Sequence, residues 1–513
     1  MFKKLLYALL VLAAGIPPLA VFSGEEKSPA EDTIRPAVVA GRFYPKSAED
    51  LRLAVQNFLR DALPRTARKP LALVVPHAGY IFSGQIAADG FKQVEGESYD
   101  TVVILGTNHT TPGFDKISVH NGRGFETPLG TAEIDHSVVG PLLASCKDCL
   151  SDERVHKDEH SIEVQVPFVQ VLFPKARIVP IIVGSADPAV AARFGEGLAA
   201  VLKNRRALVV ASSDLSHYPT ASQAEIVDPK VLAALASLDV ARLKAVIETL
   251  MKRRIPNLAT CACGEAPILA SMEAARRLGA RGARVISYLH SADTGLTGPE
   301  RVVGYGSVVM TTEEGMIPLK ERASEAPYSD SFDSAERKTL LAFARESIRR
   351  YLTTGTIPMA RGFGENLEQH RAVFVTLKRH GDLRGCIGTT TADIPLGRVV
   401  GIMALKAALA DPRFPPLDFK ELPDTEIEIS ILTRPKETSL ADIVPGRDGV
   451  VLTKGSKSAL FLPQVAIEQK WDRDMMLDQL CLKAGMEKSC WREGARFSTF
   501  QAVIFGEEPK RSQ

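Results

Sequence analysis

Three histidines in this 513-residue chain follow closely on runs of apolar residues. His77, His109 and His217 each stand within a few residues of such a run, and Asp214 lies in the same segment as His217. Apolar runs that end at Pro, Gly or Ser are typical of buried β-strands. Imidazole exchanges protons near neutral pH and is the commonest metal ligand in proteins. Histidines grouped in this way predict a site for metal binding or proton transfer.

The elements that would position these side chains alternate along residues 34–312. We expect strands at six apolar runs: 71–75, 101–106, 177–184, 207–212, 284–290 and 301–310. Segments with helical spacing of apolar residues, such as 160–173 and 188–204, lie between the runs. This alternation predicts an α/β domain with helices on both faces of one sheet. Loops at the carboxyl ends of such strands converge, so the three histidines should meet in one cleft.

Two further segments contain candidate site residues. Cys263 precedes Gly264 at the expected start of a helix, where the helix N-terminus would stabilise a thiolate. A Cys261–Cys263 disulfide or two inert thiols are the alternatives. In the other segment, His160 and Glu163 are predicted to share one face of a helix. They would either support the site or only cap and cover that helix.

Residues 1–23 have the layout of a secretory signal. Two lysines precede an apolar stretch that begins at Leu5, and small residues follow near Ser23. An uncleaved anchor is the alternative, although Pro17 and Pro18 interrupt the stretch. We therefore expect export, which would give either a periplasmic protein or one anchored to the membrane and facing the periplasm.

The seven cysteines also bear on the compartment of the protein. Cys146 and Cys149 form a close pair in the sequence and are interpreted as a disulfide or as two buried thiols. Cys481 and Cys490 are candidates for a second pair. The odd number of cysteines leaves at least one thiol unpaired.

Charge and composition describe the rest of the chain. The 63 basic residues nearly balance the 61 acidic ones, so no nucleic-acid partner is indicated. A polar stretch over 313–333 is interpreted as a linker. Residues 334–508 combine helical segments with strands joined by short Gly-containing turns, which predicts a smaller α+β domain.

The motifs that contain these residues resemble two known families. "RPAVVAGRFYP", "VVPHAGYIFSG", "ILGTNH", "DEHSIEVQVPF", "SSDLSHY" and "CGEAPI" occur in the order seen in the Memo family, also called AmmeMemoRadiSam system protein B. "LRGCIGT", "DPRFPPL" and "LFLPQVAIEQKWD" resemble the AMMECR family, AmmeMemoRadiSam system protein A. The resemblance implies a fused chain whose first domain is similar to class III extradiol dioxygenases.

The resemblance also implies roles for individual residues. In Memo-like proteins the pocket uses two histidines and a cysteine, which match His77, His109 and Cys263 as ligands of one metal ion. His217 would transfer protons, and Asp214 and His160 would orient it. A thiolate ligand makes copper or zinc more plausible than iron, as compared with the dioxygenases. We therefore expect one copper or iron ion, with zinc as a further candidate.

Several expectations about function stay open at this point. The substrate would be an unknown small molecule or peptide, and the system's name implies a radical-SAM partner, although such a partner belongs in a reducing cytosol. In the second domain, Arg384 could lower the pKa of Cys386 and make it reactive, or Cys386 could be structural. The alternatives to a metal-dependent oxidoreductase are a ligand- or partner-binding module and periplasmic metal handling.

Overall fold

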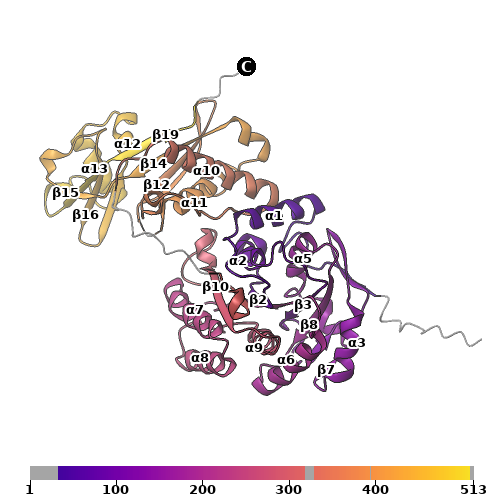
Figure 1. Cartoon of the computed structure of the whole chain (residues 1–513). Coiled ribbons are helices and arrows are strands. Elements are labelled where there is room, and N and C mark those ends of the chain that lie inside the picture. Colours follow the sequence, from indigo (N-terminus) through magenta and orange to yellow (C-terminus); the bar gives the residue numbers. More distant parts are fainter. Residues whose placement is uncertain (1–32, 318–328, 393, 509–513) are drawn as a thin grey trace, which may run out of the picture.

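The computed structural model describes residues 33–317, 329–392 and 394–508 (Figure 1). The secretory signal or anchor expected at residues 1–23 lies outside these ranges. Within them, none of the helices combines the length and the apolar character that crossing a bilayer requires.

The first domain is built on an eight-stranded sheet of order β10-β11-β2-β9-β3-β8-β4-β7. In that order the strands are Gly282–His290, Gly304–Thr311, Ala72–Val75, Ala207–Ser212, Thr101–Gly106, Arg177–Val183, Ile117–Val119 and Cys149–Leu150. The central strands β2, β9, β3 and β8 are parallel. β11 pairs with β2, β10 with β11, and β4 with β8, in each case antiparallel. The carboxyl ends of β2, β9 and β3 therefore lie side by side at one edge of the sheet.

Helices cover both faces of this sheet (Figure 1). One face carries α1 (Ala48–Asp61), α2 (Tyr80–Lys92) and α5 (Val166–Leu172), and the other carries α6 (Pro188–Leu202), α7 (Ala221–Ala236), α8 (Val240–Lys252) and α9 (Glu265–Arg277). α2 lies close against β2 because Gly90 has no side chain: a Cβ there would be 2.5 Å from Cγ1 of Val75. The predicted α/β fold is confirmed, and its core is continuous across both faces.

Shorter elements complete the first domain at its outer edge. A small sheet of order β1-β5-β6 consists of Ile34–Arg35, Gly124–Thr127 and Gly130–Glu133. α3 (His136–Ser145) and α4 (Glu153–Lys157) lie nearby in the sequence.

The second domain has two lobes. In the first lobe, α10 (Ser334–Thr354) and α11 (Leu396–Leu409) pack on a sheet of order β13-β12-β14-β19, formed by Asp382–Thr389, Val373–Arg379, Thr425–Leu432 and Ala502–Gly506. β12 and β13 form the expected hairpin, in which His380 and Gly381 both have positive φ, as a tight turn requires. The predicted α+β character is confirmed.

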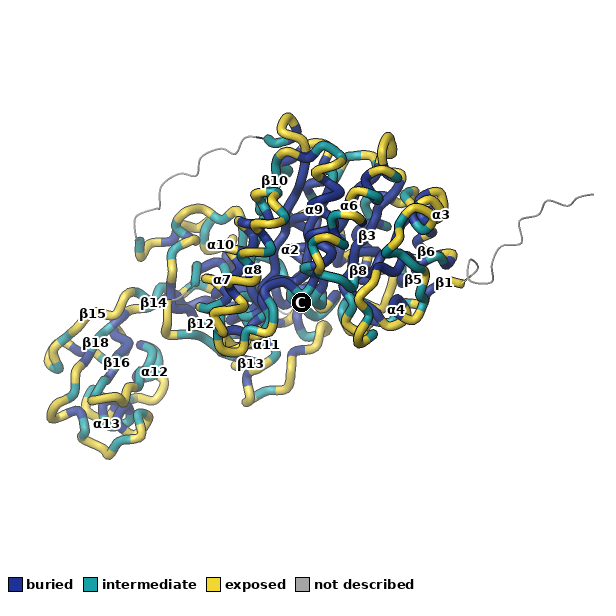
Figure 2. Tube along the Cα trace, turned by 90° about the horizontal axis from the view of Figure 1, so that it is seen from below, coloured by how far each residue is buried: buried dark blue, intermediate teal, exposed yellow. Residues whose placement is uncertain are grey.

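The second lobe has its own hydrophobic core and stands apart from the first (Figure 2). Its sheet has the order β15-β18-β16-β17, formed by Lys436–Thr438, Arg496–Phe500, Gly449–Lys454 and Lys457–Phe461. α12 (Pro463–Glu468) and α13 (Arg473–Lys483) cover this sheet. A single compact second domain was expected, and the division into two lobes is an addition that the sequence did not indicate.

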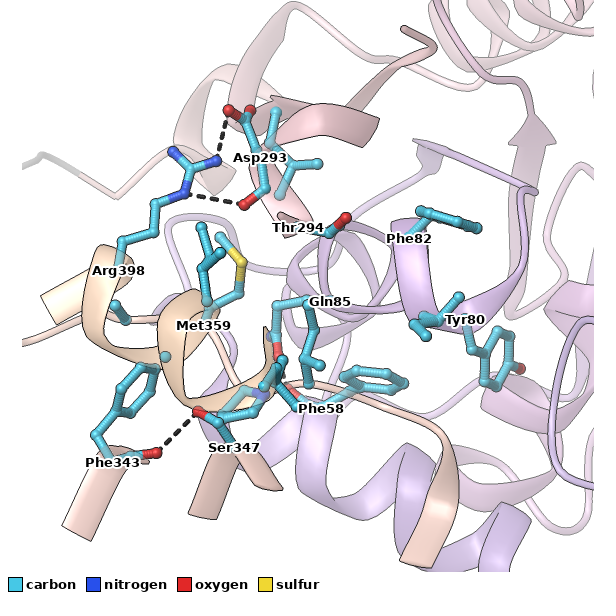
Figure 3. Close-up of a pocket in the computed structure, with 18 residues that line it drawn as sticks. Phe58, Tyr80, Phe82, Gln85, Asp293, Thr294, Phe343, Ser347, Met359 and Arg398 are labelled. Atoms are coloured by element: carbon cyan, nitrogen blue, oxygen red, sulfur yellow. Dashed lines mark hydrogen bonds and ion pairs between the residues drawn. The ribbon is translucent and has the colours of Figure 1, made fainter. Parts of the chain in front are cut away.

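Ion pairs join the two domains. Asp61 pairs with Arg350, Asp89 with Arg361, and Asp293 with Arg398; the last pair borders the interface drawn in Figure 3. A cavity of about 50 Å³ remains there, lined mainly by apolar side chains that include Phe58, Phe82, Phe343 and Met359 (Figure 3). A space of this size holds water at most, so the cavity is an imperfection of the interface and not a ligand site.

Candidate metal centre

The loops after three parallel strands bring the predicted residues together. His77 follows β2, His109 follows β3, and Asp214 and His217 follow β9, while Cys263 directly precedes the start of α9. The ligand atoms of His77, His109 and Cys263 lie within 4.8 Å of one another. Those of Asp214, His217 and Cys263 form a second group of the same size that shares the cysteine. The structure thus gathers all the candidates of the first domain at one edge of the sheet.

His77 presents an unprotonated nitrogen to the centre of the cluster. Its Nδ1 lies 3.1 Å from Oγ of Ser212, and that hydroxyl lies 2.6 Å from the carbonyl oxygen of Ser161. The carbonyl has no proton, so the hydroxyl must donate to it and accept from His77 Nδ1–H. Nε2 of His77 therefore carries a lone pair, and it lies 3.1 Å from Sγ of Cys263. Burial, together with the neighbouring His109, lowers the pKa of His77 to about 3, so the ring is neutral.

Glu159 holds His109 in a matching arrangement and is the residue that sequence reasoning missed. Its carboxylate accepts from Nδ1 of His109 at 2.9 Å and from the backbone N–H of His109 at 2.6 Å. Burial alone would raise the pKa of Glu159, but the hydrogen bond and charge of His109 outweigh it and lower the pKa to about 2. A carboxylate that accepts from Nδ1 leaves Nε2 of His109 free to bind an ion, as in many metal sites.

His160 lies beside the two candidate ligands, but not on a helix. Its ring stacks on that of His109 with centroids 4.7 Å apart, and burial lowers its pKa to about 4. The helix expected over 160–173 begins only with a 3₁₀ turn at Glu163–Gln165, followed by α5, whose first turn contains Pro167. Proline fits only the first turn of a helix, which explains the late start.

Glu163 does not share a face with His160, contrary to the expectation. It is fully buried and accepts hydrogen bonds from Tyr44 and from the backbone of Val38 and Val39, and it pairs with Arg35. All of these partners belong to the segment that contains the "RPAVVAGRFYP" motif. Glu163 therefore anchors that segment and takes no part in the site.

Cys263 is a free thiol in contact with His77. No disulfide joins it to Cys261, and both sulfurs are unpaired. Burial, together with the charge of Asp214, raises the pKa of Cys263 well above its usual range. The backbone N–H of Gly264 at the helix N-terminus acts in the opposite direction and lowers this pKa, and the thiolate expected here stays a prediction.

Asp214 and His217 have different partners from those expected. Oδ1 of Asp214 accepts from the backbone N–H groups of His77 and Ala78 at 2.7 and 3.2 Å, so it fixes the loop that carries His77. Nε2 of His217 is buried without a hydrogen-bond partner among the described residues. This buried nitrogen is therefore a candidate contact for a bound group.

The cluster is closed on one side and open on the other. The side chains of His77 and Glu159 are 2% and 1% exposed, whereas those of His109 and His160 are 29% and 21% exposed. A ligand could therefore approach past His109 and His160, while His77 lies on the closed side and Cys263 is partly buried. Two imidazoles and one thiol that can be approached from one side are suited to a single metal ion that keeps an open coordination position.

The predicted pair in the second domain does not form a reactive site of the kind expected. Arg384 lies on Glu421, with Nη2 2.9 Å from Oε2, and not on the Cys386 sulfur. Asp411 accepts from the backbone N–H of Cys386 at 2.8 Å, and Arg413 donates to the carbonyl oxygen of Cys386 at 3.2 Å. These contacts join the "LRGCIGT" and "DPRFPPL" motifs into one structural unit.

The remaining cysteines form two disulfides, Cys146–Cys149 and Cys481–Cys490. Each pair was a candidate in the sequence. Cys261, Cys263 and Cys386 are the free thiols of the described residues.

Comparison with known proteins covers both domains. Residues 35–309 match the family model described as "Memo-like protein", and residues 341–505 match the one described as "AMMECR1". A MEMO1 family protein of Aquifex aeolicus is 39% identical over 268 residues, which are 51% of this chain and 93% of that protein. A MEMO1 family protein of Methanosarcina mazei is 34% identical over 280 residues, 54% of this chain and 99% of that protein. An uncharacterized protein of Pyrococcus horikoshii with a crystal structure is 37% identical, covering 33% of this chain and 90% of that one, with a TM-score of 0.32.

Proposed function

This chain belongs to the Memo-like protein family and carries an AMMECR1 domain in the same polypeptide, and on that basis we propose that it is a metal-dependent redox protein. His77, His109 and Cys263 hold one copper or iron ion. The substrate is a small molecule or peptide that enters past His109 and His160. The observation that carries the proposal is that the ligand atoms of His77, His109 and Cys263 lie within 4.8 Å of one another, with the unprotonated Nε2 of His77 3.1 Å from the Cys263 sulfur.

The donor set is compatible with a redox-active ion. Imidazole suits copper, iron and zinc alike, and a thiolate is a soft ligand that favours copper or zinc. A bound copper or iron ion would supply electron transfer to or from dioxygen or an organic substrate at its open position. Glu159 orients His109, and Ser212 orients His77, so the two rings are fixed before an ion arrives.

His217 is the residue best placed to move protons. Burial lowers its pKa, so its ring is neutral at pH 7 and its unpartnered Nε2 can accept a proton from a substrate. Asp214 acts on the ligand side by holding the backbone of His77. Asp214 was expected to orient His217. We assign it instead to positioning His77.

The test is metal content, measured by mass spectrometry on the purified full-length chain. We expect near-stoichiometric copper or iron in the wild type and its loss in His77→Ala/His109→Ala. The matched control is His136→Ala/His380→Ala, which removes two exposed histidines outside the cluster and should keep the metal. Full occupancy in the His77/His109 variant would overturn the assignment of the site.

The same samples separate redox catalysis from the alternatives. Metal-dependent oxygen consumption with a reductant supports catalysis. Rapid exchange of Cu(I) with a competing chelator, without oxygen consumption, would favour metal handling. If the protein binds none of these metals, the remaining function is that of a ligand- or partner-binding module.

We also propose that the protein is exported, which is supported by the layout of residues 1–23 and by the two disulfides. Thiol titration of the unfolded, unreduced protein purified from whole cells that express the full-length chain tests this. Export predicts three reactive thiols, those of Cys261, Cys263 and Cys386. Titration of all seven cysteines would contradict it.

A further inference from the structure

A segment of the first domain, residues 291–303, lies next to the loop that carries His217. His217 forms a β-bridge with Thr260 on one side and another with Val303 on the other. Thr260 is three residues before Cys263, whose sulfur belongs to the same group of candidate ligands as the His217 ring. The three pieces of chain therefore lie side by side, and segment 291–303 borders the candidate metal centre next to His217.

The second domain holds segment 291–303 in place. Gly295 has a positive φ of 74°, and a Cβ there would overlap with Cγ2 of Ile402 on α11, so the two domains touch at this point. Arg398 of α11 donates from Nε to the backbone carbonyl oxygen of Asp293 at 3.1 Å and forms an ion pair with the side chain of Asp293 (Figure 3). A segment fixed in this way presents its side chains to a ligand at a lower entropic cost.

Arg301 is the cation that segment 291–303 brings to the site. Its Cζ lies 4.0 Å from the centre of the Tyr218 ring, and that ring lies 5.4 Å from the ring of His217. Within the described part of the chain Arg301 forms no ion pair and no side-chain hydrogen bond, and the neighbouring Glu300 folds back onto Gly298. Contact with an aromatic ring holds a guanidinium in place and leaves its N–H donors for another group.

The backbone of Tyr218 is strained where it supports Arg301. Its φ is +73°, a value that a bulky side chain rarely adopts. The hydrogen bond from its N–H to the carbonyl oxygen of Val302, at 2.7 Å, holds it there. Its side chain is 38% exposed, so burial of the ring does not account for the strain. Strained residues of this kind cluster at functional sites, and here the strained residue directly follows His217.

We propose that Arg301 binds a carboxylate group of the substrate, so that the site takes small organic carboxylates. This inference rests on the proposed function, because it names the substrate class of the same site. A single negative charge is favoured over a phosphate dianion, since the ionised Glu159 already places negative charge in the cluster. Tyr218 is a positioning residue that holds the guanidinium beside His217.

The experiment compares two probes of the same shape on the full-length chain, the anion 1-naphthylacetate and the neutral 1-naphthylacetamide. Equilibrium dialysis should show tighter binding of the anion by the wild type. Arg301→Gln should weaken binding of the anion about tenfold, the usual effect of losing a hydrogen bond to a charged group, and leave the affinity for the amide unchanged. Arg301→Lys keeps the charge and should recover part of the loss. The matched control is Arg52→Gln, an exposed arginine on α1, which should bind both probes like the wild type.

Alkylation of Cys263 by N-ethylmaleimide reports where the probe binds. At a concentration that half-saturates the wild type, 1-naphthylacetate should slow this reaction in the wild type and much less in Arg301→Gln. Cys386 is a partly buried free thiol of the second domain and serves as the internal control, whose rate should not change. Mass spectrometry of the alkylated peptides separates the two cysteines.

The outcome is independent of that of the metal test. Arg301→Gln should keep the metal content of the wild type, because Arg301 is not a ligand, and both probes can be measured on a chain that holds no metal. Unchanged affinity for the anion in Arg301→Gln, an equal loss for the anion and the amide, or unprotected Cys263 would overturn the inference. Tighter binding of 1-naphthyl phosphate than of 1-naphthylacetate would overturn the assignment to carboxylates.

Discussion

Glu159 is the residue whose side chain most directly controls the candidate metal centre without being a ligand. It accepts hydrogen bonds from both Nδ1 and the backbone N–H of His109. It therefore fixes both the orientation of the His109 ring and the position of the loop that carries it. We predict that Glu159→Gln lowers metal affinity about 10- to 100-fold, the usual cost of losing a carboxylate behind a histidine ligand. Competition with a chelator measures this. A comparable loss of affinity in Glu265→Gln, which removes a carboxylate paired with Lys244 outside the cluster, would show that the effect is not specific.

Cys263 makes metal binding depend on pH. Burial and Asp214 raise the pKa of its thiol, so at neutral pH an incoming ion must displace the thiol proton. Affinity should therefore rise about tenfold for each pH unit between pH 7 and 9. Calorimetric titration in two buffers with different ionisation enthalpies should detect one released proton more in the wild type than in Cys263→Ser. Equal proton release in both would exclude Cys263 as a ligand.

The sequence identified part of this site, and the structure explains which part. His77, His109 and His217 were found because each follows a strand, and strand ends can be read from apolar runs. The side chains that hydrogen-bond to the rings of the candidate histidine ligands could not be found in this way. Glu159 stands in the quoted "DEHSIEVQVPF" motif, but only the fold brings it from its loop to His109, 50 residues away. The pairing of Arg384 with Glu421 is likewise a contact between distant segments.

At the scale of elements, α7 supports the loop that carries His217. Asp228 of α7 accepts from the backbone N–H and hydroxyl of Ser216 and from the hydroxyl of Tyr288. Burial raises its pKa from 3.8 to about 7. The folded state therefore binds the Asp228 proton more tightly than the unfolded state, and the stability that results is lost as pH rises from about 4 to 7.

We predict that Asp228→Asn removes this pH dependence. The asparagine keeps the shape and one acceptor but carries no charge at any pH. From pH 5 to pH 8 the free energy of unfolding of the wild type should fall relative to the variant, by at most about 3 kcal/mol. Denaturant titrations of both proteins at each pH measure the difference, in which contributions of the other titrating groups cancel. Parallel stability curves would contradict the prediction.

The elements were more predictable than their exact limits and their grouping. The six strands expected in the first domain all exist because long buried apolar runs have few alternatives. The segment 160–173 was misjudged because its apolar spacing continues through residues that precede the helix. Nothing in the sequence of the second domain marks the junction between its two lobes. Their separation arises from packing, since each sheet is covered by its own helices.

At the scale of the whole molecule, the second domain contacts the first directly behind the metal loop. α2 begins three residues after His77, and Phe82 of α2 packs in a cluster with Ala78 and Met359 of the second domain.

The strongest link across this interface is the pair formed by Asp89 and Arg361. Asp89 lies on α2 and is fully buried, and its two oxygens accept from Nη1 and Nη2 of Arg361 at 2.6 and 2.8 Å. Its Oδ1 also accepts from the backbone N–H of Leu63. A buried carboxylate of the first domain therefore depends on the second domain for its counter-charge.

We predict that Arg361→Gln destabilises the first domain by about 3 kcal/mol or more, because it leaves the Asp89 charge buried without a partner. Asp89→Asn combined with Arg361→Gln should recover much of this loss, since no charge then remains to be solvated. Hydrogen exchange of α2 gives the readout, as both tryptophans lie in the second domain and do not report on the first. Arg206→Gln is the control: Arg206 and Asp100 form an exposed pair within the first domain, and its loss should cost less than about 1 kcal/mol. If hydrogen exchange of α2 is the same in Arg361→Gln as in Arg206→Gln, the first domain is stable without the ion pair to the second domain. Coupling of the two domains through α2 is then excluded.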